Sequence, residues 1–194
     1  FYGYNKLPSV PPKAFLSVAH KDEIVDFSDK IKNLLKSLGF SEVYNYSFVG
    51  DKELRITPVE YLQGVNSTGQ TNDTNKPSGC IEVENPIAED KKYLRQTLAP
   101  LLIRNTEDNL RFFEEVKLFE IGKVFFKEDK SPKEILNLAL IFSRKNKSSP
   151  ADRHNLFLEL KGTAETLFQQ FGLIDYSFID LDKNPRKYLI SNNR

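Results

Sequence analysis

One segment, from Glu115 to Phe126, constrains the fold of this chain more than any other. It reads EVKLFEIGKVFF, so apolar side chains fall on both alternating faces. Successive side chains of a strand point to opposite sides of its sheet. A strand that is apolar on both sides is therefore typical of a sheet interior that is covered on each face. We expect this segment to be a central strand.

A second pattern predicts a helix over residues 22–38. Apolar residues recur at alternating spacings of three and four, which places them on one helical face. They are Ile24, Phe27, Ile31, Leu34 and Leu38. Gly39 then ends the helix as a C-terminal cap. Two interpretations of this seam stay open: it packs against the chain's own sheet, or it contacts a partner helix, because its spacing is heptad-like.

The rest of the chain predicts a mixed fold. After Gly39 the residues alternate, with Tyr44, Tyr46 and Phe48 on one side, which predicts a strand. Residues 63–79 are almost entirely polar or glycine and predict a mobile surface loop. Similar patterns predict strands at residues 81–84, 135–142 and 156–158, and helices at residues 100–113 and 159–171. Without a regular alternation of elements, this indicates one α+β domain, a mostly antiparallel sheet flanked by helices.

Composition excludes several classes of protein. The 194 residues include 28 basic and 27 acidic ones, and a net charge of +1 argues against binding nucleic acid by bulk attraction. A single cysteine, Cys80, excludes an internal disulfide and a cysteine-based zinc site. No apolar stretch is long enough to cross a bilayer and no export signal opens the chain, so we expect a cytoplasmic protein without a membrane partner. A start at Phe1 without any methionine predicts a fragment.

No arrangement of residues indicates catalysis or metal binding by this chain. The two histidines, His20 and His154, fall in polar segments, and no His, Cys or Glu cluster has the spacing of metal ligands. Two basic clusters are candidates for RNA phosphates: Arg144, Lys145 and Lys147, and Lys183, Arg186 and Lys187. Neither is interleaved with exposed aromatic residues, so we expect solvated loops.

Five strings, in order along the chain, resemble the beta subunit of bacterial phenylalanyl-tRNA synthetase. They are FYGYNKLPSVPP, LLKSLGFSEVYNYSF, VENPIAEDKKYLRQTLAPLL, VKLFEIGKVFF and FLELKG. The resemblance is to its central catalytic-like domain and implies a fold similar to class II aminoacyl-tRNA synthetases. Residues 1–15, rich in aromatics and prolines, are then an extended linker from a preceding module, and residues 16–194 form the catalytic-like domain.

The resemblance allows two family motifs to be compared residue by residue. The class II dimerisation motif is a long helix followed by residues that Gly39, Phe40 and Val43 match, but Tyr46 stands where the motif has a proline. A further family string, R-T-S-L-L-P-G-L-L, corresponds to residues 95–103 and keeps its arginine as Arg95. Contacts of Arg95 with alpha, with tRNA or within its own fold stay open, and internal pairing is the safer expectation.

The second class II motif bears on catalysis. It reads phenylalanine or tyrosine, arginine, any residue and an acid, and its arginine holds the α-phosphate of ATP. Here Phe126 replaces that arginine. A phenyl ring cannot neutralise a phosphate, and the adjacent Lys127 points to the opposite face of a strand. We therefore expect no catalytic residue in this chain.

What the resemblance implies about partners follows from the family. It implies a heterotetramer with the phenylalanyl-tRNA synthetase alpha subunit and a second beta subunit, with tRNA(Phe) bound mainly through other modules. ATP and magnesium serve the whole enzyme, and we expect no cofactor in this fragment. The helix over residues 22–38 is then the candidate subunit contact, with the five apolar residues of its seam as anchors.

We expect a non-catalytic scaffold domain of a phenylalanine–tRNA ligase beta subunit, which supports heterotetramer assembly and the alpha active site. Two alternatives stay open. One is a free-standing class II adenylating enzyme that binds ATP through Lys127. The other is an RNA-binding module whose basic loops act together.

Overall fold

The computed structural model describes residues 3–11, 13, 15, 17–18, 20–56, 80–127, 131–145 and 149–176. The predicted loop at residues 63–79 lies outside these ranges. The described helices are α1 (Glu23–Ser37), α2 (Asp51–Ile56), α3 (Ala99–Asn109) and α4 (Pro150–Gln170), with the 3₁₀ turns η1 (Tyr4–Lys6) and η3 (Glu89–Lys91). The described strands are β1 (Ser41–Glu42), β2 (Phe48–Val49), β3 (Ile81–Glu82), β4 (Tyr93–Leu94), β5 (Glu115–Lys127) and β6 (Pro132–Arg144).

The larger of the two sheets in the described ranges is built around β5. β5 and β6 pair antiparallel along their full length, from Glu115 opposite Arg144 to Lys127 opposite Pro132. β1 pairs parallel with β5 on its other side, which gives the order β1-β5-β6. A smaller antiparallel sheet has the order β2-β4-β3. The central position predicted for β5 and the mixed α+β fold with largely antiparallel sheets are confirmed.

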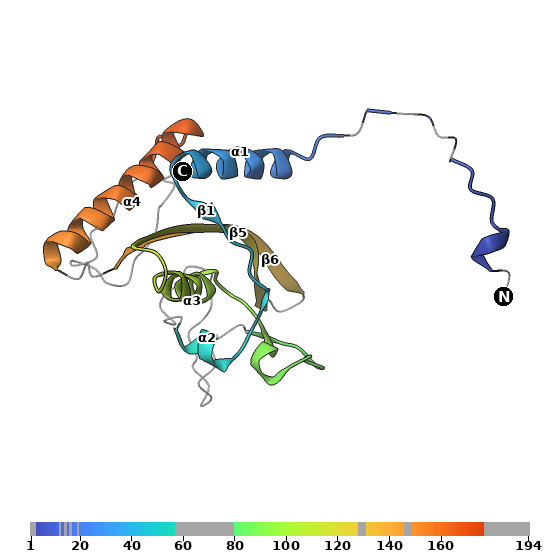
Figure 1. Ribbon diagram of the computed structural model, residues 1–194, viewed down its shortest axis with the longest axis horizontal. Coiled ribbons are helices and arrows are strands. Elements are labelled where there is room, and N and C mark those ends of the chain that lie inside the picture. The colour runs from blue at the N-terminus through green and yellow to red at the C-terminus, as the bar shows by residue number, and fades with distance from the viewer. Residues whose placement is uncertain are drawn as a thin grey trace.

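Helices cover both faces of the larger sheet (Figure 1): α3 lies on one side, and α1 and α4 lie on the other. Alternate residues of β5 therefore enter two separate cores. The core beneath α3 consists of Leu98, Leu102, Val116, Leu118 and Val124. The core beneath α1 and α4 consists of Leu35, Phe40, Phe119 and Leu167. Full burial of each such side chain contributes about 1.5–3 kcal/mol, which explains why β5 is apolar on both faces.

Helix α1 has a capping residue at each end. The side chain of Asp22 accepts hydrogen bonds from the backbone N–H groups of Ile24, at 2.9 Å, and Val25, at 3.3 Å. Gly39 follows the helix with a φ of 84°, a left-handed conformation that glycine adopts without strain. The helix predicted over residues 22–38 is confirmed.

Helix α4 corrects two expectations. The prediction of a strand at residues 156–158 is wrong, because this stretch lies inside α4. The predicted start of the helix at residue 159 is also wrong, because α4 begins at Pro150. His154 is therefore helical. The helix starts here because the hydroxyl of Ser149 accepts a hydrogen bond from the backbone N–H of Asp152, while Pro150 occupies the first turn.

The strand predicted after Gly39 is interrupted. β1 and β2 have two residues each and belong to different sheets. Residues 43–47 join them, and their burial alternates as predicted, with Tyr44 and Tyr46 exposed. Side chains of Arg95 and Glu120 bind this segment, where a regular strand would have backbone hydrogen bonds to its neighbours.

The described part of the N-terminal segment leads away from the sheets and contains the turn η1 (Figure 1). The division into a linker at residues 1–15 and a domain at residues 16–194 stays a prediction.

Candidate functional site

The apolar seam of α1 divides into two halves. Ile31, Leu34 and Leu38 pack against the core around Leu35 and Phe119. These three residues therefore pack against the chain's own sheet, which is the first of the two interpretations of the seam. Ile24 and Phe27, on the first turns, are 65% and 48% exposed. Only this half offers a large apolar surface to solvent.

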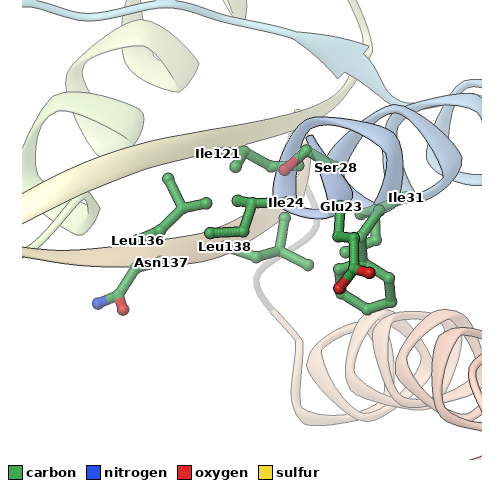
Figure 2. Close-up of a pocket in the computed structure, with 9 residues that line it drawn as sticks. Glu23, Ile24, Ser28, Ile31, Ile121, Leu136, Asn137 and Leu138 are labelled. Atoms are coloured by element: carbon green, nitrogen blue, oxygen red, sulfur yellow. The ribbon is translucent and has the colours of Figure 1, made fainter. Parts of the chain in front are cut away.

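The exposed half of the seam borders a groove of about 520 Å³ between α1 and the β5–β6 hairpin. Figure 2 shows Ile24 of α1 beside Leu136 and Leu138 of β6. The lining residues are Glu23, Ile24, Phe27, Ser28, Ile31, Ile121, Leu136, Asn137 and Leu138. The contributions of β6 could not be predicted from the helical pattern, because they depend on the register of the hairpin.

Two features fix the exposed half of α1. The ring of Phe27 packs edge-on against Phe171, which follows α4, with ring centroids 4.8 Å apart. Asp26 pairs with Lys21 at 2.7 Å and with Lys30 at 3.3 Å. The hydrogen bond from Lys21 is the main cause that lowers the pKa of Asp26 below its ordinary value. The first turns of α1 therefore have a defined position next to the groove.

Phe126, which the resemblance aligns with the class II motif arginine, is partly buried in the described structure. Its side chain is half-buried and packs against the core beneath α3. The next residue, Lys127, is exposed at the end of β5. Side chains of adjacent strand residues point to opposite faces, so Lys127 does not occupy the position that Phe126 fills.

Arg95 lies in a buried polar network. Its Nη1 is 2.6 Å from Oε1 of Glu120, and its Nε donates to the backbone oxygen of Lys123 at 3.0 Å. The other carboxylate oxygen of Glu120 accepts a hydrogen bond from Nδ2 of Asn45 at 2.8 Å. Asn105 of α3 donates to Oδ1 of Asn45 at 2.9 Å. The internal pairing expected for Arg95 is confirmed.

Two residues of the first predicted basic cluster, Arg144 and Lys145, have acidic partners. Arg144 binds Glu159 through two hydrogen bonds, at 2.7 and 3.0 Å, and also pairs with Glu115. Lys145 lies 3.6 Å from Glu114. Lys147 and the cluster of Lys183, Arg186 and Lys187 lie outside the described residues. Arg144 and Lys145 therefore offer little uncompensated charge to RNA.

The described ranges contain neither a candidate metal site nor a candidate membrane-spanning helix. No group of three or more His, Cys, Asp or Glu side chains there could hold a metal ion. No helix there is both long and apolar enough to cross a bilayer.

Comparison with solved structures defines the class of this fold. Two structures of pyrrolysyl-tRNA synthetase from Desulfitobacterium hafniense, one described as PylSc, superpose on 81% of this chain with TM-scores of 0.54 and 0.55. They share 19% sequence identity with it, and the match covers 48% and 50% of their chains. The chain therefore has a class II aminoacyl-tRNA synthetase fold.

Sequence comparison identifies the family within that class. The chain belongs to the family described as "Phenylalanyl tRNA synthetase beta chain CLM domain", whose model matches residues 7–187. It is 31% identical over 167 residues to the phenylalanine–tRNA ligase beta subunit of Solibacter usitatus and 30% identical over 195 residues to that of Fusobacterium nucleatum. These matches cover 85% and 94% of this chain but 19% and 22% of the relatives. The chain thus spans about a fifth of the length of the curated relatives it matches.

Proposed function

We propose that this chain is a non-catalytic scaffold domain of a phenylalanine–tRNA ligase beta subunit. It supports assembly with the alpha subunit and thereby the alpha active site in the aminoacylation of tRNA(Phe). One observation carries the proposal: Phe126, which the resemblance aligns with the ATP-binding arginine of the class II motif, packs against an apolar core.

The surroundings of Phe126 support the absence of catalysis. The sheet face that it shares holds Val116, Leu118 and Val124, which are buried against Leu98 and Leu102 near α3. Adenylate formation needs fixed positive charge beside the α-phosphate. The apolar side chains cannot supply that charge, and the guanidinium of Arg95, which lies on the same face, is buried and paired with Glu120. In this proposal ATP and magnesium act in the whole enzyme, on the alpha subunit.

The groove beside α1 supports the assembly role. Ile24 and Phe27 expose apolar surface next to Leu136 of β6, which is about half exposed. Contiguous apolar surface rimmed by polar residues marks protein interaction sites, and Glu23, Ser28 and Asn137 supply that rim. We assign this groove to the alpha subunit. Of the five seam residues, Ile24 and Phe27 are the primary anchors, and Ile31 lines the groove floor.

A test of the catalytic claim is phenylalanine-dependent ATP–pyrophosphate exchange. We expect no exchange above background from this chain alone, and exchange from the complex of full-length beta with alpha. A Lys127→Gln variant of beta should leave the activity of the complex unchanged. Exchange by the chain alone that is lost in Lys127→Gln would show a free-standing adenylating enzyme and overturn the proposal.

A further inference from the structure

The segment between β1 and β2 presents two tyrosines to solvent. Tyr44 is 91% exposed and Tyr46 is 74% exposed. Asn45, between them, is partly buried. Residues two apart on an extended segment share a side, so both rings lie on the side opposite Asn45.

Asn45 ties this segment to the interior of the protein. Its side-chain Nδ2 donates to Oε2 of Glu120 at 2.8 Å, and its backbone N–H donates to Oε1 of the same carboxylate at 3.4 Å. Its Oδ1 accepts a hydrogen bond from Nδ2 of Asn105 at 2.9 Å. The guanidinium of Arg95 donates to the backbone oxygens of Asn45 at 3.4 Å and Tyr46 at 3.5 Å. Both backbone polar groups and both ends of the side-chain amide of Asn45 are therefore bonded to buried or partly buried partners.

Backbone hydrogen bonds hold the two ends of the segment. The N–H of Val43 donates to the oxygen of Phe119 at 2.9 Å, and the N–H of Arg95 donates to the oxygen of Ser47 at 2.9 Å. Between these ends, the positions of the two rings depend on the contacts of Asn45. A fixed backbone lowers the entropy that is lost when the rings bind a partner.

The charges around the two rings are compensated. Lys32 and Lys36 of α1 both pair with Glu42, at 2.7 and 3.7 Å. The ammonium of Lys91 lies 4.9 Å from the centroid of the Tyr46 ring, and the two residues before it in η3 are acidic. Nucleic acids bind to uncompensated positive charge, whereas tyrosine is enriched in the cores of protein interfaces and among the residues that dominate their binding energy. These surroundings favour a protein partner over RNA.

We propose that Asn45, held by Glu120, is a positioning residue for the contact between this domain and the alpha subunit. Tyr44 and Tyr46 make the contact, and Asn45 keeps the backbone beneath them in the bound conformation before alpha binds. The inference rests on the proposed function, because it takes assembly with alpha as the role of the domain.

The residue at position 46 explains why such a restraint is needed. The resemblance aligns Tyr46 with the proline of the class II dimerisation motif. Proline restricts the backbone through its own ring. With tyrosine at this position, the restraint comes from the hydrogen bonds of Asn45 to Glu120 and Asn105.

The first measurement is amide hydrogen exchange of full-length beta, alone and assembled with alpha. Assembly should slow the exchange of residues 43–48. In beta alone, Asn45→Ala should speed the exchange of the same residues about tenfold, because local opening of the segment becomes easier. The matched control is Thr166→Ala, which removes a side-chain hydrogen bond to the backbone oxygen of Gly162 within α4. This control should leave the exchange of residues 43–48 unchanged.

The second measurement is the affinity of full-length beta for alpha. Asn45→Ala should weaken binding about tenfold, because the apparent affinity falls with the populated fraction of the binding conformation. The double variant Tyr44→Ala/Tyr46→Ala should also bind more weakly. Adding Asn45→Ala to the double variant should cause no further loss, since Asn45 acts through the rings. A residue with a separate structural role would give losses that add.

Three results overturn the proposal. The first is unchanged exchange of residues 43–48 when alpha binds, because the segment then makes no subunit contact. The second is a set of losses that add in the triple variant. The third is a loss of affinity in Thr166→Ala equal to that in Asn45→Ala. Failure of the proposed function is read separately: beta that does not assemble with alpha overturns both, whereas assembly that leaves residues 43–48 unprotected overturns only this inference.

Discussion

Arg95 and Glu120 form an ion pair inside the protein, with Nη1 of the arginine 2.6 Å from Oε1 of the glutamate and side chains that are 4% and 0% exposed. The pair joins β5 to the residue that follows β4, and through Asn45 it reaches the segment between β1 and β2. One buried contact therefore links both sheets and the segment between them. Such a pair is weak evidence for net stability, but removing one partner leaves an uncompensated charge.

We predict that Glu120→Ala destabilises the chain by about 3–5 kcal/mol, because the guanidinium of Arg95 then stays buried without its counter-charge. Urea unfolding followed by circular dichroism measures this loss. The control is Glu134→Ala, which removes an exposed pair with Lys123 and should cost no more than about 1 kcal/mol. Equal losses in the two variants would contradict the importance of the buried pair.

Gly122 makes room for this arginine. A Cβ atom at position 122 would lie 2.4 Å from Nη2 of Arg95 and 3.1 Å from Oε1 of Glu120. We expect Gly122→Ala to displace the guanidinium and to lower the free energy of unfolding by about 1–3 kcal/mol. Gly162→Ala in α4 is the matched control, because a Cβ there meets nothing within 4 Å and alanine favours a helix by about 1 kcal/mol. The midpoint temperature of thermal unfolding should fall in Gly122→Ala and rise in Gly162→Ala. A shift in the same direction for both variants would be evidence against this packing.

A third prediction concerns acid. The hydrogen bond from Arg144 lowers the pKa of Glu115 below its ordinary value of 4.5, with partial opposition from burial. A carboxylate with a lowered pKa stabilises the folded state above its unfolded pKa, and this stabilisation is lost as the pH falls through the folded pKa. Stability should therefore decline below about pH 4.5. Glu115→Gln should flatten that decline, whereas Glu114→Gln, at the exposed neighbouring residue, should flatten it less. Parallel pH profiles for all three proteins would contradict the assignment.

The longest elements could be predicted because each carries a pattern that is complete within itself. β5 is apolar on both faces, and α1 has both a seam and a glycine that ends it. The error at residues 156–158 has a physical cause: a short apolar run fits a strand or a buried helix equally well. The signal that decides between them, Ser149 before Pro150, lies several residues upstream.

The candidate site could be predicted only in part. The helical pattern identified Ile24 and Phe27, but it could not show that Leu34 and Leu38 are used by the chain's own core. Leu136 and Leu138 join the groove because of the hairpin register. Glu120, a charge between the apolar residues Phe119 and Ile121 of β5, was a signal for a buried partner, but its pairing with Arg95 is a tertiary contact.

Assembly of full-length beta with alpha, measured by gel filtration with light scattering, tests the scaffold role most directly. The variants are Ile24→Asp and Phe27→Asp in the groove, with Val25→Asp as control, since Val25 is exposed on the same turns but does not line the groove. Ile24→Asp is the cleaner of the two, because Phe27 also packs on Phe171. We predict that both groove variants weaken assembly at least tenfold while Val25→Asp assembles normally. Normal assembly of both groove variants would contradict the account.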